Sequence, residues 1–227
     1  MPLYGKGRMG RHDEHYLPKK GFGKIIVRRK PEKRIEHRTE FGEWKQFSSP
    51  LSRVSTNLGT DIAGWVRQRF EHTRRPLTVL DWGCGDGKTI EQVTQRFPGI
   101  VHAYGYDHRS YAPWLASKNV KYIHQDPGRM PRYIKKGSMD LIYSHYGITH
   151  LLQEMRTQDG IEYLHTLVEK LRPGGLFAMN MDAKHVREIA PMVLALKRLL
   201  KGRYRIESLE DHTASRSRYF VHVVRLE

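Results

Sequence analysis

Cysteine is nearly absent from this chain of 227 residues, because Cys84 is the only one. A single cysteine excludes an intramolecular disulfide framework and a zinc site built on cysteines. It also predicts a reducing, cytoplasmic location. Long apolar runs are missing too, since no stretch approaches the roughly 18 residues that a membrane-spanning helix requires. The first residues show no apolar segment typical of a secretory signal. We therefore expect a cytoplasmic protein without a membrane partner; its oligomeric state stays open.

Acidic residues are scarce relative to basic ones, and the imbalance is uneven along the chain. The formal net charge is +16 and the isoelectric point is near 10.0, which favours anionic partners. Residues 1–40 hold 12 Lys or Arg against 5 Asp or Glu, a net of +7. The other 187 residues hold 28 against 19, a net of +9. The excess charge is thus concentrated near the N-terminus.

The first 50 residues differ in composition from the rest. They are polar, basic and rich in glycine and proline, with one short strand-like run, GKIIV (23–27). The aromatic residues Phe41, Trp44 and Phe47 then follow three residues apart. We expect an arm that is either partly disordered or docked on the next domain through these aromatic side chains.

Two interpretations of the arm remain open. Its clustered basic residues are Lys19, Lys20, Lys24, Arg28, Arg29, Lys30, Lys33 and Arg34. With Tyr4, Tyr16 and Phe22 among them as stacking groups, they are typical of a segment that binds nucleic acid. The alternative is a solvated tail that aids solubility. The run HDEH at 12–15 has the residue types of metal ligands, but in such an arm we expect solvated side chains and no metal site.

From about residue 60, strand-like and helix-like segments alternate. The expected strands are 77–82, 101–107, 120–126, 139–145 and 176–181, the expected helices are 60–74, 88–97, 111–119, 160–171 and 183–200, and strand-like runs at 204–212 and 218–226 close the chain. The alternation predicts an α/β fold: a doubly wound, mostly parallel seven-stranded sheet with helices on both faces. The last two runs predict a C-terminal antiparallel hairpin. We expect an arm at 1–50 and one domain at 51–227.

One glycine-rich turn, VLDWGCGDGKTI (79–90), follows the first expected strand. Its end looks like the close of a P-loop, but that motif requires glycine where Trp82 stands. Asp140 begins its strand and does not end it, so it does not supply the magnesium-binding carboxylate of a P-loop protein. A dinucleotide-binding fingerprint would need its third glycine at Lys88. Both interpretations built on phosphate binding therefore fail.

The turn reads Asp81-x-Gly83-x-Gly85-x-Gly87 and resembles the first motif of the class I S-adenosylmethionine-dependent methyltransferases, which are Rossmann-like. Further matches follow in family order: Asp107 at the end of the second strand, Asp126 in HQDPGRMP, then SMDLIYSHYGITHLL and LRPGGLF. The resemblance covers about residues 55–227. It implies S-adenosyl-L-methionine as the cofactor.

The resemblance also implies which residues form the site. The implied cofactor-binding residues are Asp81, Gly83, Cys84, Gly85, Asp107, His108, Asp126, Pro127 and Ser144. In the family, the acid at the place of Asp107 accepts hydrogen bonds from both ribose hydroxyls. Alternatives from the residues alone are a helix cap at Asp107 and an ordinary turn at Asp126. His145 and His150 lie next to the predicted methyl site and are candidate general bases, because histidine titrates near neutral pH.

The methyl acceptor stays open between RNA and a small molecule. A cysteine nucleophile is not expected, because Cys84 lies inside the cofactor turn. Methyltransferases that act on the exocyclic amines of bases carry two prolines after the fourth strand, whereas this chain has His145-Tyr146 there. The arm favours RNA; the fourth-strand signature resembles a broad group that acts on small molecules and on some tRNA and protein targets. A non-catalytic RNA-binding protein on the same fold is the further alternative.

Overall fold

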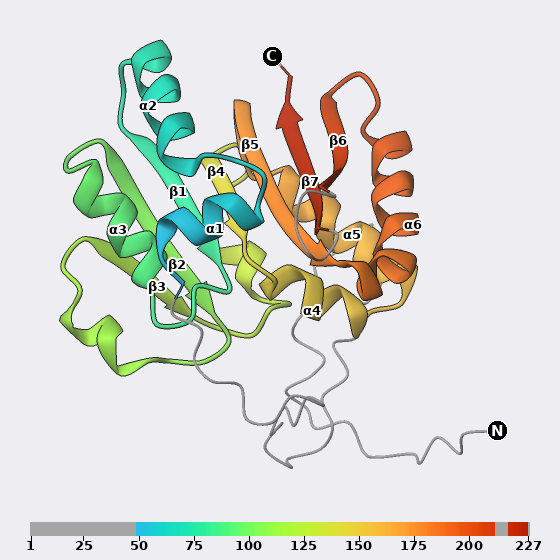
Figure 1. The fold of residues 1–227 in the computed structure, drawn as a ribbon, viewed down its shortest axis with the longest axis horizontal. Coiled ribbons are helices and arrows are strands. Elements are labelled where there is room, and N and C mark those ends of the chain that lie inside the picture. The colour runs from blue at the N-terminus through green and yellow to red at the C-terminus, as the bar shows by residue number, and fades with distance from the viewer. Residues whose placement is uncertain (1–48, 212–217, 227) are drawn as a thin grey trace.

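The computed structural model describes residues 49–211 and 218–226, which form one seven-stranded sheet with helices on both faces (Figure 1). The strand order is β3-β2-β1-β4-β5-β7-β6. The arm predicted at 1–50 lies outside the described residues apart from its last two. The expected strand at 23–27 and the aromatic residues Phe41, Trp44 and Phe47 lie outside them as well.

The sheet combines a parallel part and an antiparallel part. The parallel strands are β1 (Leu77–Trp82), β2 (Val101–Asp107), β3 (Val120–His124), β4 (Met139–Ser144) and β5 (Leu171–Asp182). The hairpin of β6 (Tyr204–Asp211) and β7 (Arg218–Arg225) adds to β5 through β7, antiparallel. The central strands β1 and β4 are covered on both faces, so their sequences are nearly continuous apolar runs. The predicted fold class is confirmed.

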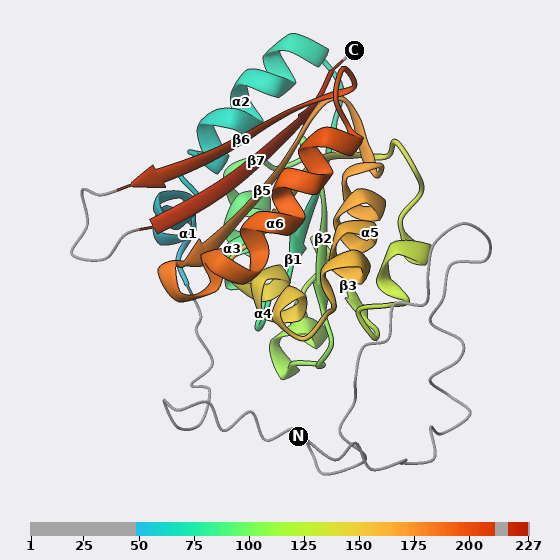
Figure 2. The same cartoon turned by 90° about the vertical axis from the view of Figure 1, so that its right-hand side faces the viewer.

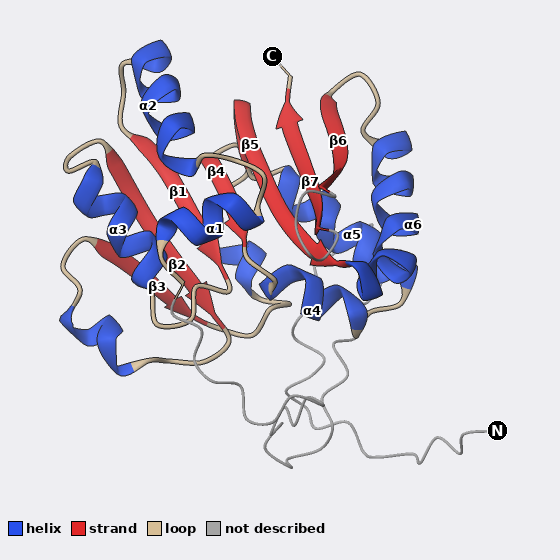
Figure 3. Ribbon diagram, viewed as in Figure 1, coloured by secondary structure: helices blue, strands red, loops and turns tan. Residues whose placement is uncertain are grey.

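Helices cover the sheet in two layers, which Figures 2 and 3 show from different sides. One layer contains α1 (Leu51–Asn57), α2 (Ile62–Thr73) and α3 (Lys88–Arg96), and the other contains α4 (Gly147–Gln153), α5 (Thr157–Val168) and α6 (Ala183–Leu199). Each layer buries its own apolar cluster against the sheet. No helix in the described ranges is both long enough and apolar enough to cross a membrane.

Several elements differ from the expected ones for local reasons. The helix expected at 111–119 is a short 3-10 turn, η2 (Ala112–Ala116), with Pro113 near its start. The third strand ends at His124 because Asp126 turns the chain: its Oδ1 accepts the Gly128 amide at 3.1 Å. A second 3-10 turn, η3 (Met130–Tyr133), follows. The fifth strand begins at Leu171, earlier than expected, and α6 continues through Pro191.

The short helix α1 was not expected. It begins after Pro50, and Leu51, Val54 and the following Leu58 are buried in the same cluster as α2 and α3. Both of its ends are fastened to distant residues. The Leu51 amide donates to Oε1 of Gln92 in α3 at 2.7 Å, and Nδ2 of Asn57 lies 2.8 Å from Nε2 of His145.

Asp140 fastens the amino ends of the central strands. Its fully buried carboxylate accepts two bonds from Arg75, at 2.9 and 2.6 Å, and one from Arg172 at 2.9 Å. It also accepts the Thr78 amide at 2.9 Å. These bonds join β1, β4 and β5 at the edge opposite the glycine turn, so Asp140 is a structural group.

Candidate active site

The glycine turn after β1 is held against its neighbours by backbone contacts. The amides of Gly83 and Cys84 both donate to the Tyr106 carbonyl of β2, at 2.8 and 2.9 Å. Gly83 has a φ of +80°, and a Cβ there would lie 2.9 Å from Cα of Gly147, the first residue of α4. Only glycine therefore allows the turn and α4 to approach each other so closely.

Gly85 occupies the centre of the turn, and its outward side is open. Its φ is +55°, and a Cβ built on it would meet no atom within 4 Å. The Gly85 amide donates to Oδ2 of Asp107 at 3.0 Å, which ties the turn to the end of β2. The result is a backbone surface at the carboxyl edge of the sheet that a ligand can approach closely, where ligands bind in open α/β sheets.

Asp107 is the central carboxylate of this edge. It is buried, and its Oδ1 accepts the Arg109 amide at 3.1 Å and lies 3.0 Å from Nδ1 of His108. A carboxylate offers about four lone-pair sites. Asp107 therefore orders the turn and keeps acceptor capacity for hydroxyl groups of a ligand.

The charges around the turn favour a cationic, hydroxyl-bearing ligand. Burial raises the pKa of the Asp81 carboxyl to about 8, and the nearby carboxylates of Asp107 and Asp86 add to the shift. A bound cation would relieve this crowding of acidic groups. Lys88, which a phosphate would require, has an exposed side chain, and its amide is bound to Asp86 at 3.1 Å. The site thus fits S-adenosylmethionine, which has a sulfonium and ribose hydroxyls, and does not fit a triphosphate.

Hydrogen bonds within the protein engage three further predicted site residues: Asp126, Pro127 and Ser144. The Asp126 carboxylate forms the turn described above, and the Pro127 carbonyl accepts the Tyr163 hydroxyl at 3.2 Å. Ser144 is fully buried, and its Oγ accepts the Ile148 amide at 2.9 Å. The Ser144 side chain therefore stabilises the first turn of α4.

The two candidate bases lie on either side of Tyr146. Nε2 of His145 is 2.8 Å from Nδ2 of Asn57, which α1 contributes. The rings of His145 and Tyr146 are 4.7 Å apart, and those of Tyr146 and His150 are 6.4 Å apart. Nδ1 of His150 lies 3.4 Å from Oε1 of Gln153. The structure thus brings His145 and His150 together at the end of β4 and the start of α4.

Backbone strain at Tyr146 supports this arrangement. Tyr146 has a φ of +67°, which is rare for a residue with a side chain. Its amide donates to Oδ1 of the buried Asn180 at 2.9 Å, and Thr149 donates its hydroxyl to the Asn180 carbonyl. Strain of this kind persists only where surrounding groups over-determine it, and it is common at functional sites.

Sequence reasoning missed three residues of this edge: Trp114, Asn57 and Asn180. The Trp114 indole donates to the Gly85 carbonyl at 2.9 Å, and its ring stacks on Tyr122 at 4.6 Å. A glycine inside a strand, Gly105, was a signal of close packing, and the group that packs there is the Tyr122 ring, 2.6 Å from where a Cβ would stand. The sequence held no comparable signal for Asn57, because its contact with His145 spans 88 positions.

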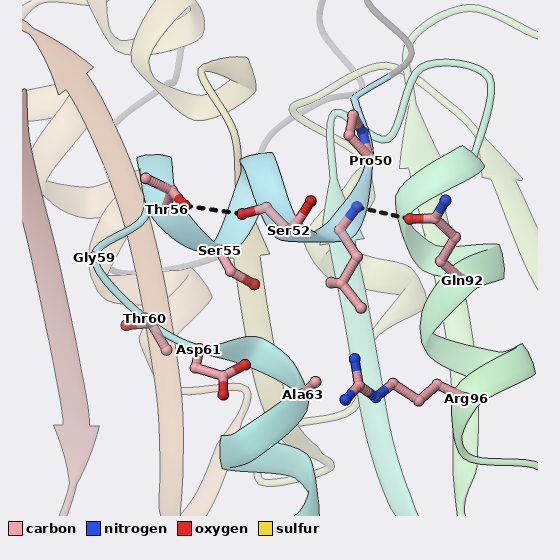
Figure 4. A pocket seen from close by; sticks show the side chains of 11 residues that line it. Pro50, Ser52, Ser55, Thr56, Gly59, Thr60, Asp61, Ala63, Gln92 and Arg96 are labelled. Carbon is pink, nitrogen blue, oxygen red and sulfur yellow. Dashed lines mark hydrogen bonds between the residues drawn. The ribbon is translucent and has the colours of Figure 1, made fainter.

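A separate pocket of about 750 Å³ lies beside α1 and α3 (Figure 4). Its lining includes Ser55, Asp61, Gln92 and Arg96, and none of the predicted site residues. It is therefore distinct from the carboxyl edge described above.

Comparisons with known proteins agree with this geometry. Residues 79–175 match the family model of a methyltransferase domain. The chain is 34% identical over 110 residues to a trans-aconitate 2-methyltransferase of Deinococcus radiodurans, a match that covers 47% of this chain and 38% of that protein. The chain thus spans less than half the length of that curated relative.

Two solved structures share the fold. The plantazolicin methyltransferase BpumL, in complex with a desmethyl analogue and SAH, superposes with a TM-score of 0.56 at 11% identity, covering 79% of this chain and 86% of that one. An rRNA methylase from Streptococcus thermophilus gives a TM-score of 0.50 at 15% identity, covering 73% and 94%.

The matched methyltransferase domain, the curated relative and the shared fold together support a class I S-adenosylmethionine-dependent methyltransferase. The family assignment made from the glycine turn and the four later motifs is confirmed. The structure of BpumL contains SAH, the demethylated form of the cofactor, which supports the expected S-adenosyl-L-methionine.

Proposed function

We propose that this protein transfers a methyl group directly from S-adenosylmethionine to an acceptor at the carboxyl edge of its sheet. The observation that carries the proposal is the acid-lined glycine turn, in which Asp107 holds the Gly85 amide while the outward side of Gly85 stays open. When bound, the cofactor supplies a methyl group on a sulfonium centre, which is already activated for transfer.

The residues that would hold the cofactor come from three consecutive strand ends. They are Asp81, Gly83, Cys84 and Gly85 at the end of β1 and in the turn after it, Asp107 and His108 at the end of β2, and Asp126 and Pro127 after β3. Asp107 would accept hydrogen bonds from hydroxyl groups, which are worth about 1.5–3 kcal/mol when one partner is charged. Ser144 would contribute indirectly, by holding the start of α4 against the turn.

His145 and His150 would serve on the acceptor side. Each carries ring nitrogens that can take a proton near neutral pH, which a hydroxyl or amine acceptor must release. The strained turn at Tyr146 and the bond to Asn57 would keep the His145 ring in one orientation. The chain's main tasks would be to hold the acceptor in line and to exclude water.

Two acceptor classes are supported by different observations. The net charge of +16, with +7 in residues 1–40, favours RNA. The similarity to a protein named trans-aconitate 2-methyltransferase favours a small molecule. RNA is the better supported acceptor, because the charge is a property of this chain itself.

A transfer assay with tritium-labelled cofactor tests the proposal. The purified protein is incubated with co-purifying RNA in one sample and with a small-molecule cell extract in another. We expect label in RNA; label in the extract alone would assign a small acceptor. Cofactor binding without label in either sample would contradict methyl transfer and support the non-catalytic RNA-binding alternative.

A further inference from the structure

A group of cations gathers at the edge of the sheet opposite the candidate active site. This amino-edge cluster consists of Lys136, Lys170, Arg203 and Arg225. They come from the loop before β4, the link between α5 and β5, the turn after α6 and the end of β7. These segments meet where β4 and β5 begin, at the top of Figure 1.

Backbone hydrogen bonds hold these segments together in pairs. The amide of Gly137 donates to the Glu169 carbonyl at 3.0 Å, and that of Ser138 to the Lys170 carbonyl at 2.9 Å. The loop that carries Lys136 is thereby fixed to the end of α5. Likewise, the Leu226 amide donates to the Arg203 carbonyl at 3.0 Å, which joins the turn after α6 to the end of β7. The cations are close because the fold places them there.

The positive charge of the cluster is only partly neutralised. Nζ of Lys136 lies 2.5 Å from Oε1 of Glu169, and a guanidinium nitrogen of Arg225 donates to the Leu171 carbonyl at 2.6 Å. Neither Lys170 nor Arg203 forms an ion pair with any residue in the described part of the chain. Glu169 is thus shared among several cations and is already bound to one of them.

Burial and the surrounding charges shift the pKa values of Lys170 and of the neighbouring His165. Burial lowers the pKa of the half-buried Lys170; Glu169 opposes the shift and Lys136 adds to it. Burial also lowers the pKa of His165. Glu169 opposes this shift, and Arg203 and Lys136 add to it. On an ordinary solvated face, long cationic side chains turn away from one another. Lys136 lies near enough to lower the pKa of Lys170, and a bound anion would relieve this repulsion.

We propose that the amino-edge cluster docks the phosphate backbone of RNA. Cations supplied by four segments suit a chain of phosphates better than a single ion. The guanidinium of Arg203 offers the planar fork that binds phosphate in two places. This docking is independent of methyl transfer and of residues 1–40.

A pair of double variants of the full chain tests the proposal. Lys170→Gln/Arg203→Gln removes two charges from the cluster, and the control Lys118→Gln/Lys121→Gln removes two exposed charges near β3, at the other end of the sheet order. Binding of a fluorescently labelled RNA duplex is measured by anisotropy over a salt series. The cluster variant should bind about tenfold more weakly and lose about one to two units of salt slope, as expected for one unit per phosphate contact. The control should keep the slope of the unaltered chain.

Equal slopes for the two double variants would overturn the proposal. Polyglutamate is added as a competitor at the same concentration of charge as unlabelled RNA. If it competes as effectively as that RNA, the surface would be assigned to acidic proteins instead. A second readout needs no folded variant. The lysines of the unaltered protein are reductively methylated with ¹³C, which keeps their charge, and the pKa of Lys170 is followed by NMR. Saturating RNA should raise that pKa, and an unchanged value would contradict docking at the cluster.

Discussion

At the scale of single residues, the surroundings of Cys84 decide its chemistry. Burial, together with the carboxylates of Asp81 and Asp107, raises the pKa of its thiol well above the ordinary value. The thiol is therefore protonated near neutral pH and is a poor nucleophile. Its position inside the cofactor turn had suggested the same from the sequence.

We expect Cys84→Ala and Cys84→Ser to retain most methyl transfer, because the turn requires only a small side chain at this position. Turnover with labelled cofactor and cofactor affinity are measured on both variants. A covalent adduct trapped on Cys84, or full loss of turnover with affinity intact, would contradict direct transfer.

Asn57 offers a second test at this scale, because its side-chain amide lies 2.8 Å from Nε2 of His145. Asn57→Asp replaces the amide by a carboxylate and should raise the pKa of His145 by about one unit. The acid limb of the pH–rate profile should shift upward with it. NMR titration of the His145 ring reads the pKa without any activity.

The matched control for Asn57 is Thr56→Asp, which adds the same charge at the exposed neighbouring position. It should move the pKa of His145 much less. Equal shifts in the two variants, or no shift in Asn57→Asp, would remove Asn57 as the residue that positions His145.

The tight backbone of the glycine turn could be anticipated from the sequence, and the contacts around His145 could not. Motifs such as Asp81-x-Gly83-x-Gly85 record local backbone demands, so spacing alone identifies them. The bond between Asn57 and His145 depends on how two distant elements pack, which no local pattern encodes. Ser144 is the opposite case. It belongs to a motif that the sequence shows, but its hydroxyl oxygen accepts the Ile148 amide inside the fold.

At the scale of elements, most strands and helices followed from periodicity and turn residues, and α1 did not. Its seven residues are too few to show a full helical period against the basic segment before them. Leu51, Val54 and Leu58 form a stripe that makes sense only once α3 is beside it. Similarly, β5 extends back through Gly174 and Gly175 because Leu171, on their far side, pairs with Met139 of β4 after a shift in register.

The junction of β1, β4 and β5 depends on Asp140, and its removal should destabilise the whole domain. Asp140→Ala leaves two arginines without their buried partner, and we expect a loss of about 3 kcal/mol in the free energy of unfolding. The control Glu207→Ala breaks the exposed pair with Arg205 and should cost less than about 1 kcal/mol. Urea titration distinguishes the two, and equal losses would contradict the assigned role.

The pH dependence of stability has a definite sign at Asp140. Burial alone would raise the pKa of this carboxyl, but the bonds from Arg75 and Thr78 hold it below its ordinary value of 3.8. Its contribution is therefore present above that value and is lost as the pH falls through the lower pKa of the folded protein. Asp140→Asn should show a shallower loss of stability on acidification than the unaltered chain.

At the scale of the whole molecule, the excess positive charge is uneven along the chain, because residues 1–40 carry a net of +7 out of the total of +16. We predict that those 40 residues recruit RNA. About five phosphate contacts would give a slope of log affinity against log salt near −4. Deleting residues 1–40 should flatten the slope and weaken RNA binding by well over tenfold.

The same deletion should leave cofactor affinity nearly unchanged, because the predicted cofactor residues all lie beyond residue 80. The slope that remains should come from the amino-edge cluster. Equal slopes with and without residues 1–40 would remove the arm from RNA recognition. Weak RNA binding by both proteins, with unaltered turnover on a small acceptor, would favour a small-molecule substrate.

The central claim is that the acid-lined turn binds S-adenosylmethionine, and calorimetry tests it most directly. The unaltered chain should bind the cofactor and its demethylated product at one site per chain with low-micromolar affinity, and magnesium–ATP should not compete. Asp107→Ala should weaken binding roughly ten- to a hundredfold, since charge-assisted bonds worth about 1.5–3 kcal/mol are lost. Wild-type affinity in Asp107→Ala, or preferential binding of magnesium–ATP, would contradict the account.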